Sequence, residues 1–173
     1  MPAPGPDTVD VDALAGSGAE LERRYPLADF SRLADLLAAV HGEAVAKFAF
    51  ARLAQGLPGC DLSLATTVTL TCQRCLEAFE LPLQTSARLA FVASEDDASQ
   101  VPDGFDAIPA DDGRIDLAAL VEDELLLSLP VVALHPAGSE CAAAARRAER
   151  EARAVPDAGK HRPFAQLQDL LKH

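Results

Sequence analysis

Apolar and polar residues alternate at two-residue spacing on both sides of a short turn near the middle of the chain. The stretch from Thr66 to Phe91 reads TTVTLTCQRCLEAFELPLQTSARLAF, and such alternation is typical of β-strands with one buried face. We predict a hairpin whose strands cover Asp61 to Cys72 and Phe79 to Phe91. Pro82 lacks the amide hydrogen that a strand ladder uses, so we expect it at an edge position or a bulge.

The chain before this hairpin predicts a helix and one more strand. Between Pro26 and Val40, apolar residues recur at three- and four-residue steps, as in an amphipathic helix, and Gly42 ends it. The weaker alternation from Ala44 to Leu53 predicts a strand. Residues 1–20 are rich in Pro, Gly, Ala and Asp and have no periodicity, so we predict a flexible N-terminus.

A second helix is predicted from Leu117 to Ser128, after an acidic loop and a short strand over 105–110. Asp116 is a favourable N-cap, and Pro130 stops the helix. Its apolar face is predicted to consist of Leu117, Leu120, Val121, Leu125 and Leu127.

One carboxylate is out of place on that helix. Glu124 falls in the middle of the predicted apolar face, whereas its neighbours Glu122 and Asp123 are expected to point away. Arg74, in the hairpin turn, carries donors that fit a carboxylate. Either Arg74 and Glu124 pair, tying the turn to the helix, or Glu124 faces a partner or reaches solvent at the helix edge and Arg74 is a solvated turn residue.

The C-terminal part of the chain is predicted to be helical and weakly basic. Cys141 to Ala154 is rich in Ala and Arg, and Pro163 to Lys172 has the spacing of a short amphipathic helix that docks on its own domain or on a partner. The apolar side of that last helix consists of Phe164, Leu167, Leu170 and Leu171.

These elements predict an α+β fold, with a mainly antiparallel sheet or partly open barrel, a packed helix and a C-terminal helix. We divide the chain into a flexible N-terminus over 1–20, a core over 21–140 in which structure begins near Leu21, and a helical tail over 141–173. No apolar run reaches the roughly 18 residues of a membrane span, and no secretory leader is visible. The expected location is therefore the cytoplasm, without membrane contact.

The charge of the chain argues against direct attachment to RNA as its main activity. The net charge is −12 over 173 residues, and phosphate binding needs a basic face. From Phe91 to Glu124 there are eleven carboxylates and one arginine. This stretch is either a solvated acidic surface or an attractor for Lys- and Arg-rich protein segments.

The four cysteines are the main chemical feature. Cys72 and Cys75 lie in the hairpin turn, and Cys141 and His135 can complete a set of four ligands for a structural zinc ion. Plain buried thiols, or a thiol–disulfide redox pair at Cys72 and Cys75, are the alternatives. Cys60 lies outside the set. No catalytic spacing of the histidines and no glycine-rich phosphate loop is present, so we expect neither an enzyme nor a small-molecule substrate.

Three separated motifs resemble the YceD family of large ribosomal RNA subunit accumulation proteins. They are LTCQRCLEAFELPL, then RIDLAALVEDELLLSLPVVALHP with Cys141 soon after, and finally PFAQLQDLLK, in the family's order. Many members carry a cysteine-rich segment after the second motif. Here Cys141 is followed by four alanines, which leaves three thiolates and weakens the zinc assignment.

The resemblance implies a small bacterial, non-enzymatic factor that supports synthesis, processing or stability of large-subunit ribosomal RNA. Combined with the charge, it leads us to expect a basic ribosomal protein, or the RNA or a precursor particle, as the partner. The rival interpretations are a redox protein acting through Cys72 and Cys75, and a zinc-binding interaction module unrelated to ribosomes.

Overall fold

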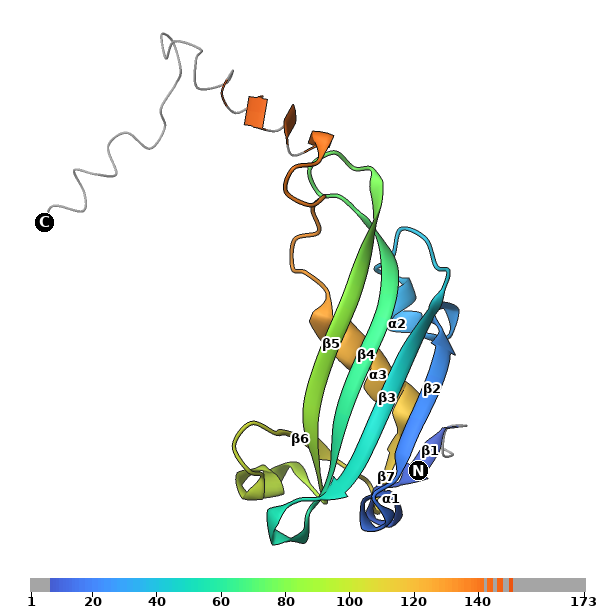
Figure 1. Cartoon of the computed structure of the whole chain (residues 1–173), viewed down its shortest axis with the longest axis vertical. Helices are drawn as coiled ribbons and strands as arrows, with labels where there is room; N and C mark the ends of the chain where they lie inside the picture. The colour runs from blue at the N-terminus through green and yellow to red at the C-terminus, as the bar shows by residue number, and fades with distance from the viewer. Residues whose placement is uncertain (1–6, 142, 145, 148–149, 151–173) are drawn as a thin grey trace, which may run out of the picture. The chain divides into compact units, whose positions relative to one another are not determined.

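The structure is a computed structural model that describes residues 7–141, 143, 144, 146, 147 and 150. By their contacts the residues divide into two units, Met1–Leu134 and His135–His173. The first unit holds all the named helices and strands (Figure 1). In chain order these are β1 (Thr8–Asp10), α1 (Val11–Ser17), β2 (Glu20–Pro26), η1 (Leu27–Asp29), α2 (Ser31–Ala34), β3 (Glu43–Arg52), η2 (Ala54–Gly56), β4 (Pro58–Thr71), β5 (Ala78–Val92), η3 (Glu95–Gln100), β6 (Asp106–Pro109), β7 (Arg114–Asp116) and α3 (Leu117–Ser128).

A five-stranded sheet in the order β2-β3-β4-β5-β6 forms the framework. All its pairs are antiparallel except β5 with β6, which is parallel. The predicted hairpin is confirmed as β4 and β5, paired without interruption from Gly59↔Ala90 to Thr71↔Ala78. The α+β class is also confirmed, with an open sheet and not a closed barrel. A second, two-stranded sheet pairs β1 with β7.

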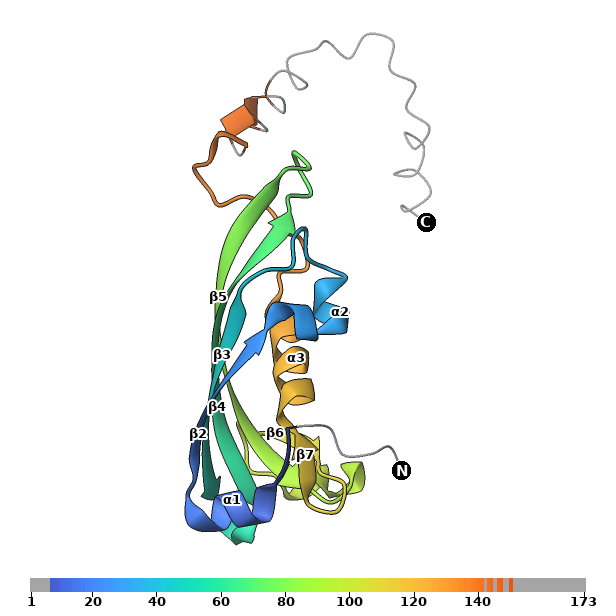
Figure 2. The same ribbon diagram turned by 90° about the vertical axis from the view of Figure 1, so that its right-hand side faces the viewer.

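The core lies between one face of the sheet and the helices. Figure 2 shows α2 and α3 on the same side of the sheet, while none of the described elements covers the other face. Alternating strand residues such as Phe48, Leu62 and Leu89 are at most 2% exposed and pack towards α3. The two-residue alternation of the sequence therefore corresponds to a sheet with one buried and one solvated face.

Helix α3 forms with the predicted bounds because its first turn is capped. The Asp116 carboxylate accepts hydrogen bonds from the N–H groups of Ala118 (2.9 Å) and Ala119 (3.3 Å). Leu117, Val121 and Leu125 are fully buried on its inner side. In Figure 1 the helix crosses behind the sheet obliquely and ends beside the outer edge of β5.

Regular structure begins earlier than predicted. Strand β1 pairs with β7 through Val9↔Ile115, and Asp10 caps α1 by accepting from the Ala13 N–H at 2.9 Å. Val11 is 1% exposed. The start predicted near Leu21 is wrong because a three-residue strand and a seven-residue helix are too short to show periodicity, and distant partners stabilise them.

The helix predicted from Pro26 to Val40 is also wrong. Strand β2, which pairs with β3, ends at Pro26, and the range then holds only the single turns η1 and α2 and an isolated bridge from Ala39 to Thr69. Leu27, Phe30 and Leu33 are at most 3% exposed. Their three-residue spacing suits consecutive tight turns as well as a continuous helix, so the periodicity alone did not separate the two.

In the second unit, the Ser139 N–H donates to the Pro136 carbonyl at 3.2 Å, and helical residues begin at Glu140 and Cys141. The predicted amphipathic segment with Phe164, Leu167, Leu170 and Leu171 lies outside the described residues. Apart from the point at which regular structure begins, the division into 1–20, 21–140 and 141–173 stays a prediction.

Candidate functional site: the thiol turn and the two sides of helix α3

The turn that joins β4 to β5 is closed by its own backbone. The Cys72 N–H donates to the Glu77 carbonyl at 2.9 Å, and the Leu76 N–H donates to the Cys72 carbonyl at 2.8 Å. Leu76 has a φ of +64°, a conformation that a non-glycine residue adopts in tight turns. Cys72 is fully buried and Cys75 is half-buried. We call Cys72 to Cys75 the thiol turn.

The chain that leaves α3 is held at this turn by a backbone hydrogen bond. The Gln73 N–H donates to the Ala133 carbonyl at 2.8 Å. The segment after α3 thus brings Ala133 to Gln73, although the two residues are sixty positions apart in the sequence.

The structure brings together the four residues that the sequence singles out as metal ligands. The ligand atoms of Cys72, Cys75, His135 and Cys141 all lie within 4.8 Å of one another. Zn–S bonds of about 2.3 Å at tetrahedral angles place two thiolate sulfurs about 3.8 Å apart. None of the four cysteines, all within the described residues, forms a disulfide. By their number and kind these four donors can hold a metal ion.

Cys60 is not part of this group, as expected. It lies in β4 opposite Leu89 and is 2% exposed. Burial raises the pKa of its thiol to about 12. Cys60 is therefore a small core residue and a suitable control for experiments on the other thiols.

Glu122 is the residue on α3 that sequence reasoning placed wrongly. It is 8% exposed, and its Oε1 accepts from the backbone N–H groups of Arg32 (2.8 Å) and Leu33 (3.2 Å). Its Oε2 accepts from the Arg32 guanidinium at 2.7 and 3.0 Å, and Asp123 accepts a further guanidinium hydrogen bond at 2.6 Å. We call Arg32, Glu122 and Asp123 the α2–α3 clamp.

The clamp keeps Glu122 ionised although it is buried. Burial raises the pKa of Glu122, but the Arg32 guanidinium and the two backbone N–H groups lower it by more, so the net pKa lies below the ordinary value. Glu122 falls just beyond Val121 and Leu125 around the helix. The helical periodicity of the sequence was therefore informative, but we centred the predicted apolar face of α3 too far towards Glu124 and Leu127.

Glu124 lies on the opposite side of α3, and none of the residues that the structure describes is a cationic partner for it. Among the described residues, no ion pair joins it to Arg74, so the predicted Arg74–Glu124 pair is not formed. Burial, and then the nearby carboxylates of Asp106 and Asp123, raise the pKa of Glu124. Leu127, which we expected in the core, is 80% exposed. The end of α3 beside β5 thus presents an unpaired acid and an exposed leucine.

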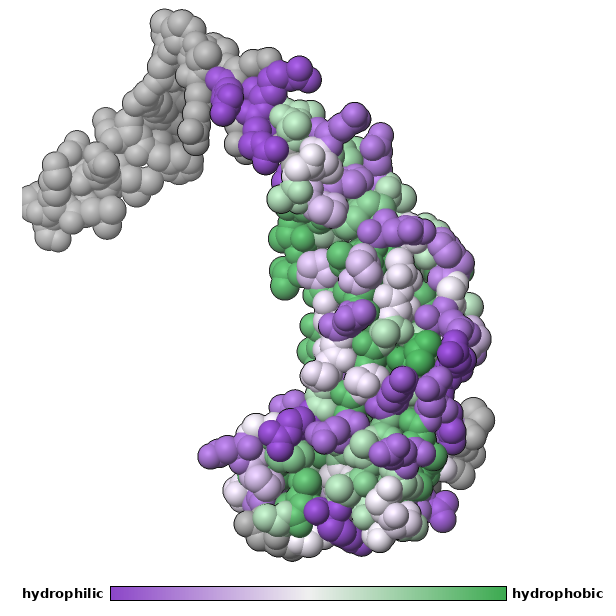
Figure 3. All heavy atoms as spheres, viewed as in Figure 1, coloured by the Kyte–Doolittle hydropathy of each residue, from purple (hydrophilic) through white to green (hydrophobic). Residues whose placement is uncertain are grey.

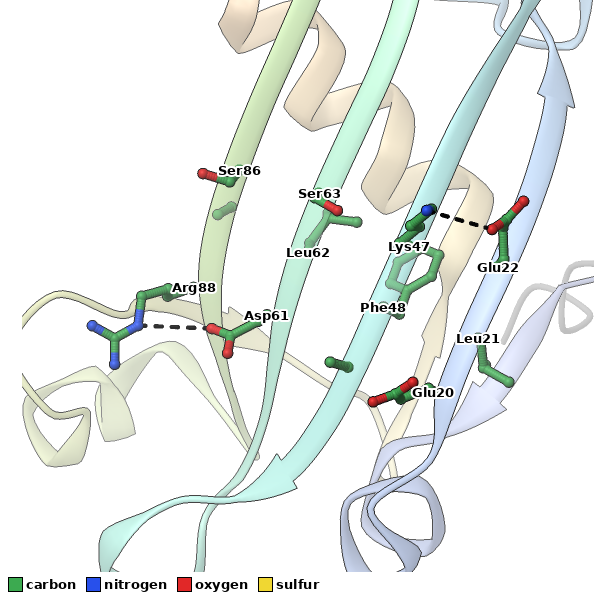
Figure 4. A pocket seen from close by; sticks show the side chains of 12 residues that line it. Glu20, Leu21, Glu22, Lys47, Phe48, Asp61, Leu62, Ser63, Ser86 and Arg88 are labelled. Atoms are coloured by element: carbon green, nitrogen blue, oxygen red, sulfur yellow. Dashed lines mark ion pairs between the residues drawn. The ribbon is translucent and has the colours of Figure 1, made fainter.

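The solvated face of the sheet carries a hollow of about 700 Å³. Figure 4 shows that two ion pairs lie along it, Lys47–Glu22 at 3.8 Å and Arg88–Asp61 at 3.7 Å. Small side chains such as Ser63 and Ser86 line the space between them. Because these charges largely pair with one another, the hollow is a less specific ligand site than the thiol turn.

None of the described helices is both long and apolar enough to span a bilayer.

Comparison with known proteins gives one family. A model of the family described as "Large ribosomal RNA subunit accumulation protein YceD" matches residues 60–171. A protein with the same description from Haemophilus influenzae (strain ATCC 51907 / DSM 11121 / KW20 / Rd) is 32% identical over 149 residues, which cover 84% of this chain and 84% of the relative. No solved structure matches.

Proposed function

The chain belongs to the YceD family, and from that premise we propose that it is a cytoplasmic, non-enzymatic factor that supports accumulation of large-subunit ribosomal RNA. The description of the relative names this role, and the family match includes the thiol turn, α3 and the tail. We assign the role to binding: the chain holds a basic ribosomal protein and reaches the RNA through it.

The observation that supports this choice of partner is the distribution of charge. The eleven carboxylates between Phe91 and Glu124 fall on η3, β6, β7, α3 and their loops. Phosphate groups are repelled by such a surface, whereas Lys- and Arg-rich protein segments are attracted to it. A factor of this charge can keep a basic ribosomal protein soluble and deliver it to the RNA.

Depletion of the chain in its host tests the role. We expect the ratio of large-subunit to small-subunit ribosomal RNA to fall, and re-expression of the wild-type chain to restore it. The matched control is re-expression of a variant that does not fold. An unchanged ratio on depletion, together with recovery of neither ribosomal proteins nor precursor particles by the tagged chain, would favour an interaction module unrelated to ribosomes.

We also propose that Cys72, Cys75, His135 and Cys141 hold a structural zinc ion. Three thiolates and one imidazole form a ligand set that zinc uses in closed structural sites, and the donor atoms lie within 4.8 Å of one another. Such an ion would fix the residues after α3 against the thiol turn, adding to the Gln73–Ala133 hydrogen bond. Its role is to shape this end of the protein, not to catalyse.

Metal analysis of protein purified without chelator tests the zinc proposal. We expect about one zinc per chain, strongly reduced in Cys75→Ser and Cys141→Ser and unchanged in Cys60→Ser. Removal of zinc should lower the midpoint of thermal unfolding. A metal-free protein with a reactive, low-pKa thiolate at the turn would contradict the proposal and favour the redox alternative.

A further inference from the structure

Strand β5 has an outer edge that the sheet leaves open for most of its length. On one side β5 pairs with β4 from Ala78 to Ala90, but on the other side β6 pairs only with Leu89 to Val92. Gly104, with a φ of +82°, lies in the turn just before β6 begins. Among the described elements, none pairs with the outer edge from Ala78 to Arg88 (Figure 1). We call this the β5 edge.

The register identifies which backbone groups face outwards. Pro82 sits opposite Thr67 within the continuous β4–β5 ladder, and because it has no N–H its backbone must face away from β4. Val92, also even-numbered, directs its carbonyl outwards, where it accepts from the Ala110 N–H at 2.8 Å. The outward N–H and C=O groups on the β5 edge are therefore those of the even-numbered residues, including Glu80, Gln84 and Ser86.

Exposed apolar side chains lie on the helix side of this edge. Leu127, at the end of α3, is 80% exposed, and Val131 and Val132 after it are 96% and 54% exposed. Leu81 of β5 is half-buried on the same side of the sheet. Figure 3 shows hydrophobic surface along this flank of the molecule. An added strand would cover it with every second side chain.

The charges beside the edge are acidic and available. Glu80 is exposed on β5, and the Asp106 carboxylate lies close enough to Glu124 to help raise the pKa of Glu124. Arg88 is already engaged, because its guanidinium carbon is 4.0 Å from the centre of the Phe105 ring and its Nε is 3.7 Å from Asp61. The edge therefore complements lysine and arginine.

We infer that the β5 edge binds an extended, Lys- and Arg-containing segment of a basic protein as an additional strand, in line with β6. This inference rests on the proposed function and specifies how the basic partner is held. Main-chain hydrogen bonds give the affinity. Side chains on the helix side of the added strand meet Leu127, Val131 and Glu124, and the alternate side chains lie on the solvated side with Glu80. Strand β6 shows that the same edge accepts a parallel strand.

Two other occupants fit less well. A second copy of the chain would bring Glu80, Asp106 and Glu124 against the same acids, at a net charge of −12 for each copy. The chain's own tail, 163–172, has its apolar residues at three- and four-residue steps, and not in the two-residue alternation that an added strand needs.

A matched pair of variants at one position tests the inference on the full chain. Gln84→Pro removes an outward N–H and blocks an added strand, but leaves the β4 ladder intact, while Gln84→Ala keeps the N–H. The probe is a fluorescent peptide that alternates lysine and valine, with a peptide that alternates glutamate and valine as control. We expect wild type and Gln84→Ala to bind the lysine peptide equally and Gln84→Pro to bind it about tenfold more weakly.

Hydrogen exchange followed by NMR gives a second readout that does not depend on folding of the variant. In the wild-type chain the lysine peptide should slow exchange at Glu80, Gln84 and Ser86. Equal binding to both variants, or protection elsewhere, would overturn the inference while leaving the ribosomal role open. Two further results would overturn the inference by identifying a different occupant. One is a dimer that dissociates in Gln84→Pro. The other is slow exchange of the edge amides without peptide that becomes fast in Leu167→Asp, which would identify the tail.

Discussion

The two sides of helix α3 differ in how their charges are satisfied. Towards α2, the buried Glu122 accepts four hydrogen bonds from Arg32 and Leu33. Towards β5, Glu124 meets other carboxylates, and Leu127 is exposed. The residues are neighbours in sequence, so local composition does not explain the contrast. The side closed by the chain itself contributes to stability, and the open side is the one to which we assign partner binding.

The largest expected effect on stability comes from comparing substitutions of two leucines on α3. Leu125 is fully buried and Leu127 is 80% exposed. We expect Leu125→Ala to lower the free energy of unfolding by about 2–5 kcal/mol and Leu127→Ala to change it by less than about 0.5 kcal/mol. Urea unfolding of both variants measures the difference. Similar losses for the two would mean that Leu127 is covered in solution.

Removal of the clamp carboxylate should have the next largest effect. Glu122→Ala leaves the Arg32 and Leu33 N–H groups and the guanidinium without their acceptor, so we expect a loss of about 2–4 kcal/mol in the free energy of unfolding. Asp123→Ala, which removes only an exposed ion pair, should lose less than about 1 kcal/mol. If Glu122→Ala were as stable as Asp123→Ala, the clamp would not hold α2 on α3.

Neutralising Glu124 should act in the opposite direction. Because its neighbours are carboxylates, Glu124→Gln should stabilise the free protein at neutral pH by a few tenths of a kcal/mol. The same change should weaken binding of a basic partner beside β5. Thermal unfolding and peptide binding measure the two effects on one sample. A destabilised Glu124→Gln would reveal a partner for this carboxylate within the chain.

The smallest expected effect is a difference in how Glu122 and Glu124 make the stability depend on pH. The lowered pKa of Glu122 means that its contribution is fully present above the ordinary value of 4.5 and is lost as pH falls through the lower folded value. The raised pKa of Glu124 gives a contribution that is present below 4.5 and is lost as pH rises through the higher folded value. We therefore expect Glu122→Gln to make the free energy of unfolding less dependent on pH below 4.5. Glu124→Gln should do the same above 4.5, and urea unfolding at a series of pH values measures both.

Sequence patterns succeed in this protein where an element is long or has a specific cap. The β4–β5 hairpin, β3 and α3 follow from alternation, helical spacing and the Asp116 cap. The edge position of Pro82 follows from its missing N–H. The elements before β3 do not follow, because β1, α1 and α2 are short and are stabilised by β7, β3 and α3.

The candidate sites show the same limit. The sequence identified Cys72, Cys75, His135 and Cys141 because their chemistry is distinctive, although their approach depends on the course of the chain after α3. The burial of Glu122 and Glu124 was predicted wrongly. A small rotation of the predicted apolar face about the helix axis is enough to make Glu124 the buried acid in place of Glu122. No sequence pattern within β5 or β6 shows that β6 pairs with only the last residues of β5 and leaves the rest of the β5 edge open.

The most direct test of the central claim compares two kinds of ligand for the purified chain. Large-subunit ribosomal proteins and protein-free large-subunit RNA are titrated separately with the labelled chain near physiological ionic strength, where long-range attraction is screened. We predict that at least one basic ribosomal protein binds specifically and that the naked RNA binds weakly. Tight binding of the naked RNA, with no binding of any ribosomal protein, would contradict the account.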